Sequence, residues 1–270
     1  MKFLPLFLLL CFLTFSACAS DDDKDGATLE DEKISAEEQY DIAQNKLEES
    51  NYKSAAEAFL EIERQYPYSQ WAITAQIQAA YAYYKNEKYD EAIGTLERFI
   101  KLNPGNENVA YGYYLIALSY YNQISSVSRD QGITVKARKA LGDVASRYPD
   151  SDYGRDARFK LDLVEDHLAG KEMSVGRYYL ERKRYIGAIN RFKIVVEEYP
   201  TTAQVEEALH RLVEAYLALG VVPEAQKYAA VLGNNYPESE WYKDSYDLLV
   251  NGKLESSAPQ ESDKSWYKVW

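Results

Sequence analysis

The chain has 270 residues, of which 46% are hydrophobic, and this content excludes a wholly disordered protein. It carries 43 acidic and 31 basic side chains, and the resulting net charge of −12 argues against a nucleic-acid-binding protein, which needs clustered cations. A mean hydropathy of −0.48 argues against a membrane protein with several spans. Two Cys and two His leave little material for a metal site or a Cys/His nucleophile, whereas 25 Tyr is an unusually high count.

Residues 1–17 are interpreted as a lipoprotein signal peptide. Lys2 supplies the positive charge, and the apolar stretch 3–15 is too short to cross a bilayer as a helix. The sequence Phe-Ser-Ala-Cys that ends at Cys18 resembles the bacterial lipobox, which implies cleavage before Cys18 and attachment of lipid to it. The alternative is an ordinary signal peptide that happens to contain a Cys.

Cleavage there would remove Cys11 and leave Cys18 acylated, so the mature chain would have no thiol for a disulfide bond. Residue 19 is Ala, whereas an Asp directly after the lipidated Cys resembles the signal for retention in the inner membrane. The expected location is therefore the periplasmic face of the outer membrane, with the lipid as anchor. Residues 18–33, which contain an acidic run, are expected to form a solvated tether.

Residues 34–250 are expected to form an all-α solenoid of five tetratricopeptide (TPR) helical hairpins. Apolar residues recur there at helical spacing, and a proline closes each apolar stretch. Consecutive prolines are 37 to 51 residues apart, close to the tetratricopeptide period of about 34 residues with additions. The prolines are Pro67, Pro104, Pro149, Pro200 and Pro237, and the predicted repeats span 36–70, 73–107, 110–150, 153–203 and 206–248.

Small residues support this register, because the two helices of a repeat cross closely at positions 8 and 20. Counting back from the prolines places such residues 12 positions apart in four repeats, as Ala43/Ala55, Ala80/Ala92, Gly176/Ala188 and Val213/Ala225. The third repeat fits through Ala117 and Ala137 only with an insertion around 125–132. The long spacing before Pro200 predicts one long first helix over 153–182 in the fourth repeat.

The first helices of such a stack line a groove, and tetratricopeptide grooves bind ligands rather than catalyse reactions. Tyr offers a large apolar face and a hydroxyl that tolerates water, as a peptide-binding surface requires. Packing of individual tyrosines between helices is the alternative. The candidate groove residues in this register are Tyr40, Tyr81, Tyr84, Lys85, Tyr111, Tyr114 and Tyr121.

Several segments carry a more specific pattern: YAYYKN at 81–86, RFIKLNP at 98–104, RYPDS at 147–151, and GRYYLER at 176–182 followed by AINRF at 188–192. Together with the lipobox, the five repeats and the insertion, they resemble the BamD family, the tetratricopeptide lipoproteins of the outer-membrane β-barrel assembly (BAM) machinery. The resemblance covers about residues 18–245, which is nearly the whole mature chain.

This resemblance implies a non-enzymatic BAM subunit that takes part in inserting β-barrel proteins into the outer membrane. The implied partners are the insertase BamA, bound through its POTRA domains, other BAM lipoproteins, and unfolded outer-membrane protein precursors. Arg191 falls where the family places a basic contact to the last POTRA domain; a surface ion pair with Glu197 or Glu198 is the alternative. A precursor peptide with a terminal aromatic residue is expected to lie across Tyr81, Tyr84, Tyr111 and Tyr114, with Lys85 attracting its carboxylate.

No Gly-rich phosphate loop and no GxSxG motif occurs in the sequence, so no catalytic residue is expected. His167 and His210 have no partners at metal-ligand spacing and are interpreted as packed or solvated, so neither a metal nor a cofactor is expected beyond the lipid on Cys18. The competing functions are a periplasmic tetratricopeptide adaptor for cell division or polysaccharide export, and a peptidoglycan-cleaving lipoprotein. Residues 251–270, which end in WYKVW, are expected to be a disordered tail; occlusion of the groove by its aromatic end is a hypothesis.

Overall fold

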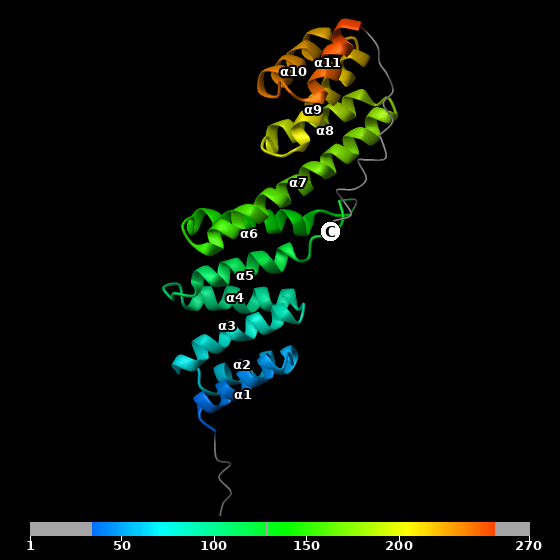
Figure 1. The fold of residues 1–270 in the computed structure, drawn as a ribbon. Helices are drawn as coiled ribbons and strands as arrows, with labels where there is room; N and C mark the ends of the chain where they lie inside the picture. Colours follow the sequence, from blue (N-terminus) through cyan, green and yellow to red (C-terminus); the bar gives the residue numbers. More distant parts are fainter. Residues whose placement is uncertain (1–33, 128, 252–270) are drawn as a thin grey trace, which may run out of the picture. The chain divides into compact units, whose positions relative to one another are not determined.

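The computed structural model describes residues 34–127 and 129–251 (Figure 1). Within these ranges the chain forms eleven α-helices and no β-strand, which confirms the all-α prediction. The predicted signal peptide, the lipidation site Cys18, the tether and the tail from 252 onward lie outside the described residues. The helices are α1 (Ala36–Glu48), α2 (Tyr52–Gln65), α3 (Gln70–Lys85), α4 (Tyr89–Leu102), α5 (Val109–Tyr121), α6 (Gly132–Arg147), α7 (Asp152–Glu181), α8 (Tyr185–Glu198), α9 (Gln204–Ala218), α10 (Val222–Asn235) and α11 (Glu240–Asn251).

The helices form two layers of tetratricopeptide-type hairpins. Each helix packs on the next one along the chain, and α1 to α10 form consecutive pairs (Figure 1). The odd-numbered helices also pack against one another in order, from α1 with α3 to α9 with α11. In the described part of the chain, no two even-numbered helices pack together. The odd layer is therefore closely packed, whereas the even layer leaves space between its helices.

The residues expected at the close helix crossings are all buried. At the α7/α8 crossing, a Cβ added to Gly176 would clash with the ring of Phe192, so only glycine fits there without rearrangement. Small residues at the other crossings likewise let the two helices of a pair approach, and a large apolar side chain fills the space beside them in most pairs. The buried crossing residues are Ala43, Ala55, Ala80, Ala92, Ala117, Ala137, Gly176, Ala188, Val213 and Ala225.

The expected insertion and the expected long helix are both present. Residues 122–131 connect α5 to α6, where the other pairs have connections of only a few residues. The helix expected over 153–182 is α7, which is 30 residues long and packs against α5, α6, α8 and α9. Its N-cap residue is Ser151, whose hydroxyl oxygen accepts a hydrogen bond from the backbone N–H of Gly154 at 3.0 Å.

Four of the five hairpin turns share one backbone conformation. One residue in each turn has a positive φ, between 58° and 76°, and it follows the first crossing residue of its pair by seven positions. The next N–H donates to a carbonyl five residues before it, as from Lys88 to Tyr83 at 2.9 Å, which is the Schellman arrangement. Only the last turn uses glycine; the residues with positive φ are Ser50, Glu87, Lys183 and Gly220.

Glycine at Glu87 or Lys183 should therefore stabilise the chain. A left-handed conformation costs a non-glycine residue about 1–2 kcal/mol, and the greater chain entropy of glycine offsets part of that gain. We expect Glu87→Gly and Lys183→Gly each to raise the free energy of unfolding by about 0.5–1 kcal/mol in urea titrations. Gly220→Ala is the matched reverse change and should destabilise; stabilisation by Gly220→Ala would contradict the turn geometry.

Helix α11 was not predicted as a separate element. It packs on α9, where the hydroxyl of Ser245 lies 2.9 Å from Nδ1 of His210 and the Trp241 ring lies 5.2 Å from the imidazole. It also packs on α10, where the ring of Tyr242 leaves no room for a Cβ at Gly233. α11 therefore covers the end of the last hairpin.

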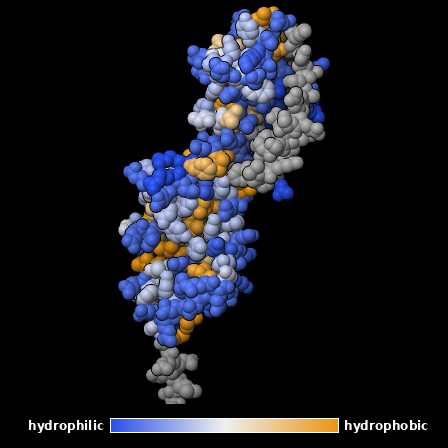
Figure 2. Space-filling view, viewed as in Figure 1, coloured by the Kyte–Doolittle hydropathy of each residue, from blue (hydrophilic) through white to orange (hydrophobic). Residues whose placement is uncertain are grey.

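The surface matches the acidic, hydrophilic composition. The face shown in Figure 2 is mainly hydrophilic, with hydrophobic residues in small separate patches. Large exposed apolar side chains include Tyr68 in the α2–α3 connection, Phe159 on α7 and Ile186 on α8. None of the helices in the described ranges combines the length and the apolar character needed to cross a membrane.

Candidate peptide-binding groove

Five tyrosines from α3, α5 and α7 lie together on the layer of odd-numbered helices. Spacings of three residues place Tyr81 with Tyr84 on one face of α3, and Tyr111 with Tyr114 on one face of α5. The ring of Tyr153, at the start of α7, lies 5.1 Å from that of Tyr114 and 5.7 Å from that of Tyr111. All five side chains are half-buried, so each presents part of its surface to solvent.

The hydroxyls of this cluster are close enough to affect one another. Burial, followed by the neighbouring phenols of Tyr81, Tyr153 and Tyr84, raises the pKa of Tyr111 well above its ordinary value. The Tyr84 hydroxyl accepts a hydrogen bond from the side-chain amide of Asn122 at 2.8 Å. Tyr111 therefore presents a neutral hydroxyl beside its aromatic face at physiological pH.

A charged pair borders the cluster on α7. The Tyr114 hydroxyl donates to Asp156 at 2.6 Å, and the Lys160 ammonium donates to the same carboxylate at 2.9 Å. Burial opposes ionisation of Asp156, but the hydrogen bonds from Tyr114 and Lys160 hold its pKa below the ordinary value. The same ammonium lies 5.8 Å from the centre of the Tyr121 ring, so Tyr121 extends the cluster along α5.

Two predicted groove residues lie apart from this cluster. Tyr40 packs in the core of the first hairpin, with its ring 5.4 Å from Phe59 and 4.9 Å from Trp71. Lys85 is exposed, and its ammonium lies 5.9 Å over the ring of Tyr52 on α2. The structure thus brings together Tyr81, Tyr84, Tyr111, Tyr114 and Tyr121 but leaves Tyr40 and Lys85 outside. Lys160, through Asp156 and Tyr121, is a cation at the border of the cluster.

Sequence reasoning missed Tyr153, Asp156 and Lys160. The expected groove positions were counted within repeats of standard length, and the first helix of the fourth pair is far longer than the standard. The three residues have i, i+3, i+7 spacing, which places them on one face of the helix near its start. This spacing could have indicated that they belong to the groove.

Arg191 lies on α8 and pairs with the preceding helix. Its guanidinium Nη1 lies 3.0 Å from Oε2 of Glu172 on α7, and 40% of the arginine side chain remains exposed. The alternative of an intramolecular ion pair is therefore present, but its partner is Glu172 on α7 and not Glu197 or Glu198. Part of the guanidinium is therefore oriented by Glu172 while its exposed part remains accessible to another protein.

A more buried charge network joins α7 to α9. Glu207 accepts from Arg177 at 2.7 Å and from Arg211 at 3.2 Å, and Arg211 also donates to Glu214 at 2.9 Å. The buried His210 stands beside it; burial, followed by the charge of Arg211, lowers its pKa to about 4. The Arg177–Glu207 pair links α7 to α9, whereas both contacts of Arg211 lie within α9.

Both histidines are buried. His167 is buried in α7, and burial lowers its pKa. In residues 34–127 and 129–251, no three or more His, Cys, Asp or Glu side chains are grouped so that they could hold a metal ion.

Residues 32–232, which include the tyrosine cluster and Arg191, match the model of a family described as an outer membrane lipoprotein, YfiO. The outer membrane protein assembly factor BamD of Caulobacter vibrioides is 45% identical, over 88% of this chain and 78% of that protein. BamD of Rickettsia prowazekii is 46% identical, over 76% of this chain and 82% of that protein. The chain belongs to the BamD family.

More distant BamD proteins align over a larger share of the chain. BamD of Neisseria meningitidis is 34% identical, over 96% of both chains. Among solved structures, the TPR2AB domain of yeast Sti1 aligns with a TM-score of 0.41 and 15% identity, over 79% of this chain and 81% of that one. The tetratricopeptide protein TTC0263 of Thermus thermophilus aligns with a TM-score of 0.37 and 16% identity, over 80% and 99%.

Proposed function

We propose that this BamD-family chain is a scaffold subunit of the outer-membrane protein assembly machinery, and that its groove binds unfolded barrel precursors. The role as an outer membrane protein assembly factor is that of the relatives that cover most of the chain. The observation that carries the groove assignment is the half-buried tyrosine cluster between α3, α5 and α7. Such a role requires binding surfaces rather than catalysis.

The chemistry of the cluster suits an extended peptide with an aromatic end. Tyrosine rings offer faces and edges for another aromatic ring, and their hydroxyls hydrogen-bond to a peptide backbone. The cation for a terminal carboxylate is Lys160 rather than Lys85, because Lys160 borders the cluster on α7 and Lys85 faces Tyr52. A bound carboxylate would take the place of Asp156 on this ammonium.

The proposal includes a lipid anchor on Cys18 that holds the chain at the periplasmic face of the outer membrane. Its support is the lipobox pattern together with the description of the matching family as an outer membrane lipoprotein. Several acyl chains at one residue give durable attachment, since each buried methylene contributes about 0.8 kcal/mol.

Arg191 is our proposed contact to the POTRA domains of the insertase BamA; the other BAM lipoproteins are further proposed partners. An arginine whose guanidinium is oriented by Glu172 and still 40% exposed is prepared for a second carboxylate on a partner. Charge reversal there would replace attraction by repulsion without opening the core, because the crossing residue Ala188 and the large Phe192 are unchanged.

The test is affinity purification of the Cys18-anchored protein from detergent-solubilised envelopes, with mass spectrometry of the co-eluting proteins. We expect a roughly stoichiometric barrel protein with POTRA domains, and at least a tenfold loss of it with Arg191→Glu. Arg138→Glu is a matched control, because Arg138 makes a comparable ion pair with Glu165 and is 39% exposed. Equal recovery of the barrel protein with Arg191→Glu and with Arg138→Glu would refute the Arg191 assignment. Co-elution of cell-division or polysaccharide-export proteins in place of a barrel protein would refute the assembly role.

A further inference from the structure

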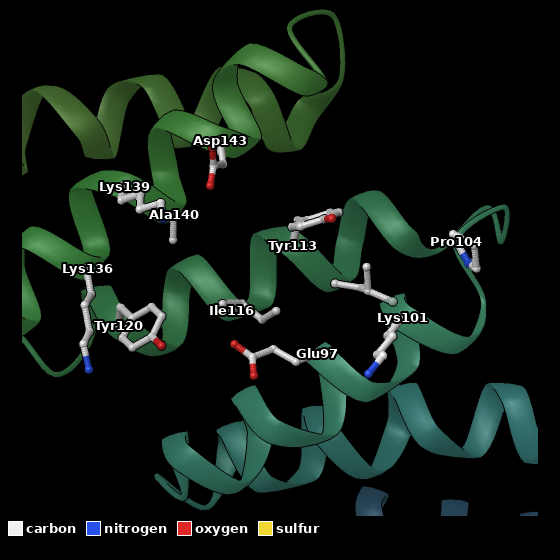
Figure 3. Close-up of a pocket in the computed structure, with 11 residues that line it drawn as sticks. Glu97, Lys101, Pro104, Tyr113, Ile116, Tyr120, Lys136, Lys139, Ala140 and Asp143 are labelled. Atoms are coloured by element: carbon white, nitrogen blue, oxygen red, sulfur yellow. The ribbon is translucent and has the colours of Figure 1, made fainter.

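A cavity lies on the opposite side of α5 from the tyrosine cluster. It has a volume of about 650 Å³ and lies between α4 and α6, with α5 as its floor (Figure 3). Tyr113, Ile116 and Tyr120 face this cavity, whereas Tyr111 and Tyr114 face the groove. The cavity exists because the even-numbered helices do not pack together and so leave a space over the odd layer.

Cationic side chains surround this cavity in an otherwise acidic protein. Lys101 comes from α4, and Lys136 and Lys139 come from α6; none of the three forms an ion pair with a residue of the described ranges. Glu97 and Asp143 also line the cavity, so its walls carry one net positive charge while the chain carries −12. The net positive charge of its walls therefore attracts carboxylates.

A cation stands beside each of the two tyrosines that mark the ends of the floor: Lys136, which lines the cavity, and Arg147, which lies next to the lining residue Tyr113. The Lys136 ammonium lies 5.7 Å from the centre of the Tyr120 ring. The Arg147 guanidinium lies 5.0 Å from the Tyr113 ring, and its Nη1 lies 3.3 Å from the Tyr113 hydroxyl. Between these ends the floor is apolar, because Ile116 is buried there.

The spacing of the two ends fits a short extended peptide. Tyr113 and Tyr120 are seven residues apart on α5, which corresponds to about 10 Å along the helix axis. An extended chain covers that distance in about three residues. A free phosphate or a single carboxylate would reach only one end of the floor and would leave the apolar part uncovered.

We propose that this cavity docks an acidic segment of a partner protein, with an apolar side chain over Ile116 and a carboxylate near each end. The lysines act as point charges for the carboxylates, and burial of the apolar side chain supplies the remaining affinity. The volume falls within the range of about 300–1,000 Å³ that is usual for ligand pockets. This inference does not depend on precursor binding in the groove, which lies on the other face of α5.

The test is fluorescence anisotropy with the full mature chain and two labelled peptides, Ser-Gly-Asp-Glu-Leu-Phe-Asp-Glu-Gly-Ser and the same peptide with every acid replaced by Lys. We expect saturable binding of the acidic peptide only. Lys136→Glu combined with Lys139→Glu should weaken it at least tenfold, and Lys101→Glu, from another helix, should also weaken it. Circular dichroism checks that the variants remain helical.

Tyr114→Ala separates this cavity from the groove, since it should leave the binding of the acidic peptide unchanged. The proposal is overturned if the acidic peptide fails to bind at 1 mM, or if both peptides bind equally. It is also overturned if the Lys→Glu variants bind normally or if Tyr114→Ala abolishes binding. Displacement of the peptide by millimolar inorganic phosphate at constant ionic strength would indicate a small-anion site and would likewise overturn it.

Discussion

Replacement of Phe192 by Ala should lower the free energy of unfolding by about 3–5 kcal/mol, the usual cost of removing a buried aromatic ring. The Phe192 side chain is fully buried in the largest apolar cluster of the described residues, and it fills the α7/α8 crossing against Gly176. Because the interior is closely packed, no neighbouring side chain can fill the space that the ring leaves without a shift of α7 or α8. Urea unfolding followed by circular dichroism measures the loss.

A double-mutant cycle would show that this contact is the cause. Gly176→Ala alone should destabilise by about 1–3 kcal/mol, because its Cβ would clash with the Phe192 ring. With Phe192→Ala present, that penalty should disappear, so the two changes should be non-additive by at least about 1 kcal/mol. Gly94→Ala on α4 is the control, since nothing lies within 4 Å of its added Cβ and alanine is the better helix former. Additive losses at Gly176 and Phe192 would show that the crossing is not packed as described.

The combined change Tyr111→Ala and Tyr114→Ala should weaken binding of a precursor peptide by roughly 700-fold. Aromatic residues at the centre of an interface contribute about 2 kcal/mol or more each, and 1.4 kcal/mol corresponds to a factor of ten. The measurement is fluorescence anisotropy with a labelled peptide that ends in Phe and has a free carboxylate. Tyr113→Ala with Tyr120→Ala, on the opposite face of α5, should leave that affinity unchanged.

Conservative variants separate the roles of the rings and the hydroxyls. Tyr114→Phe keeps the ring beside Tyr153 and removes only the hydrogen bond to Asp156. It should therefore retain most of the affinity if stacking dominates. Unchanged affinity after removal of both rings would end the assignment of this groove to precursor peptides.

The register of the stack was predictable because it depends on local rules. A proline after each second helix and a small residue at each crossing are set by backbone chemistry and by close packing, both of which can be read from spacing. Ala80 and Ala92 illustrate this. Their separation of 12 residues predicted a close crossing, and both are buried between α3 and α4.

The composition of the groove was only partly predictable, because it depends on how far one helix extends past another. Tyr153 reaches the cluster through the first turn of α7, and Arg191 meets Glu172 through a later turn of the same helix. Lys85 has the expected position on α3, but its flexible side chain turns to the ring of Tyr52.

The left-handed turns at Glu87 and Lys183 could not be predicted for another reason, since these residue types do not signal a positive φ.

The length of α7 has a consequence for how the chain loses its structure. A stack in which each helical pair touches only its neighbours can open from one end, pair by pair. α7 packs against helices of three pairs, and the apolar cluster around it extends from Ala117 to Leu232. Opening any of these pairs would expose part of α7 and break that common core. Residues from α5 onward should therefore unfold as a single cooperative block. Helices α1 to α4 bury smaller apolar clusters, which reach no further than α5, and can open at lower cost.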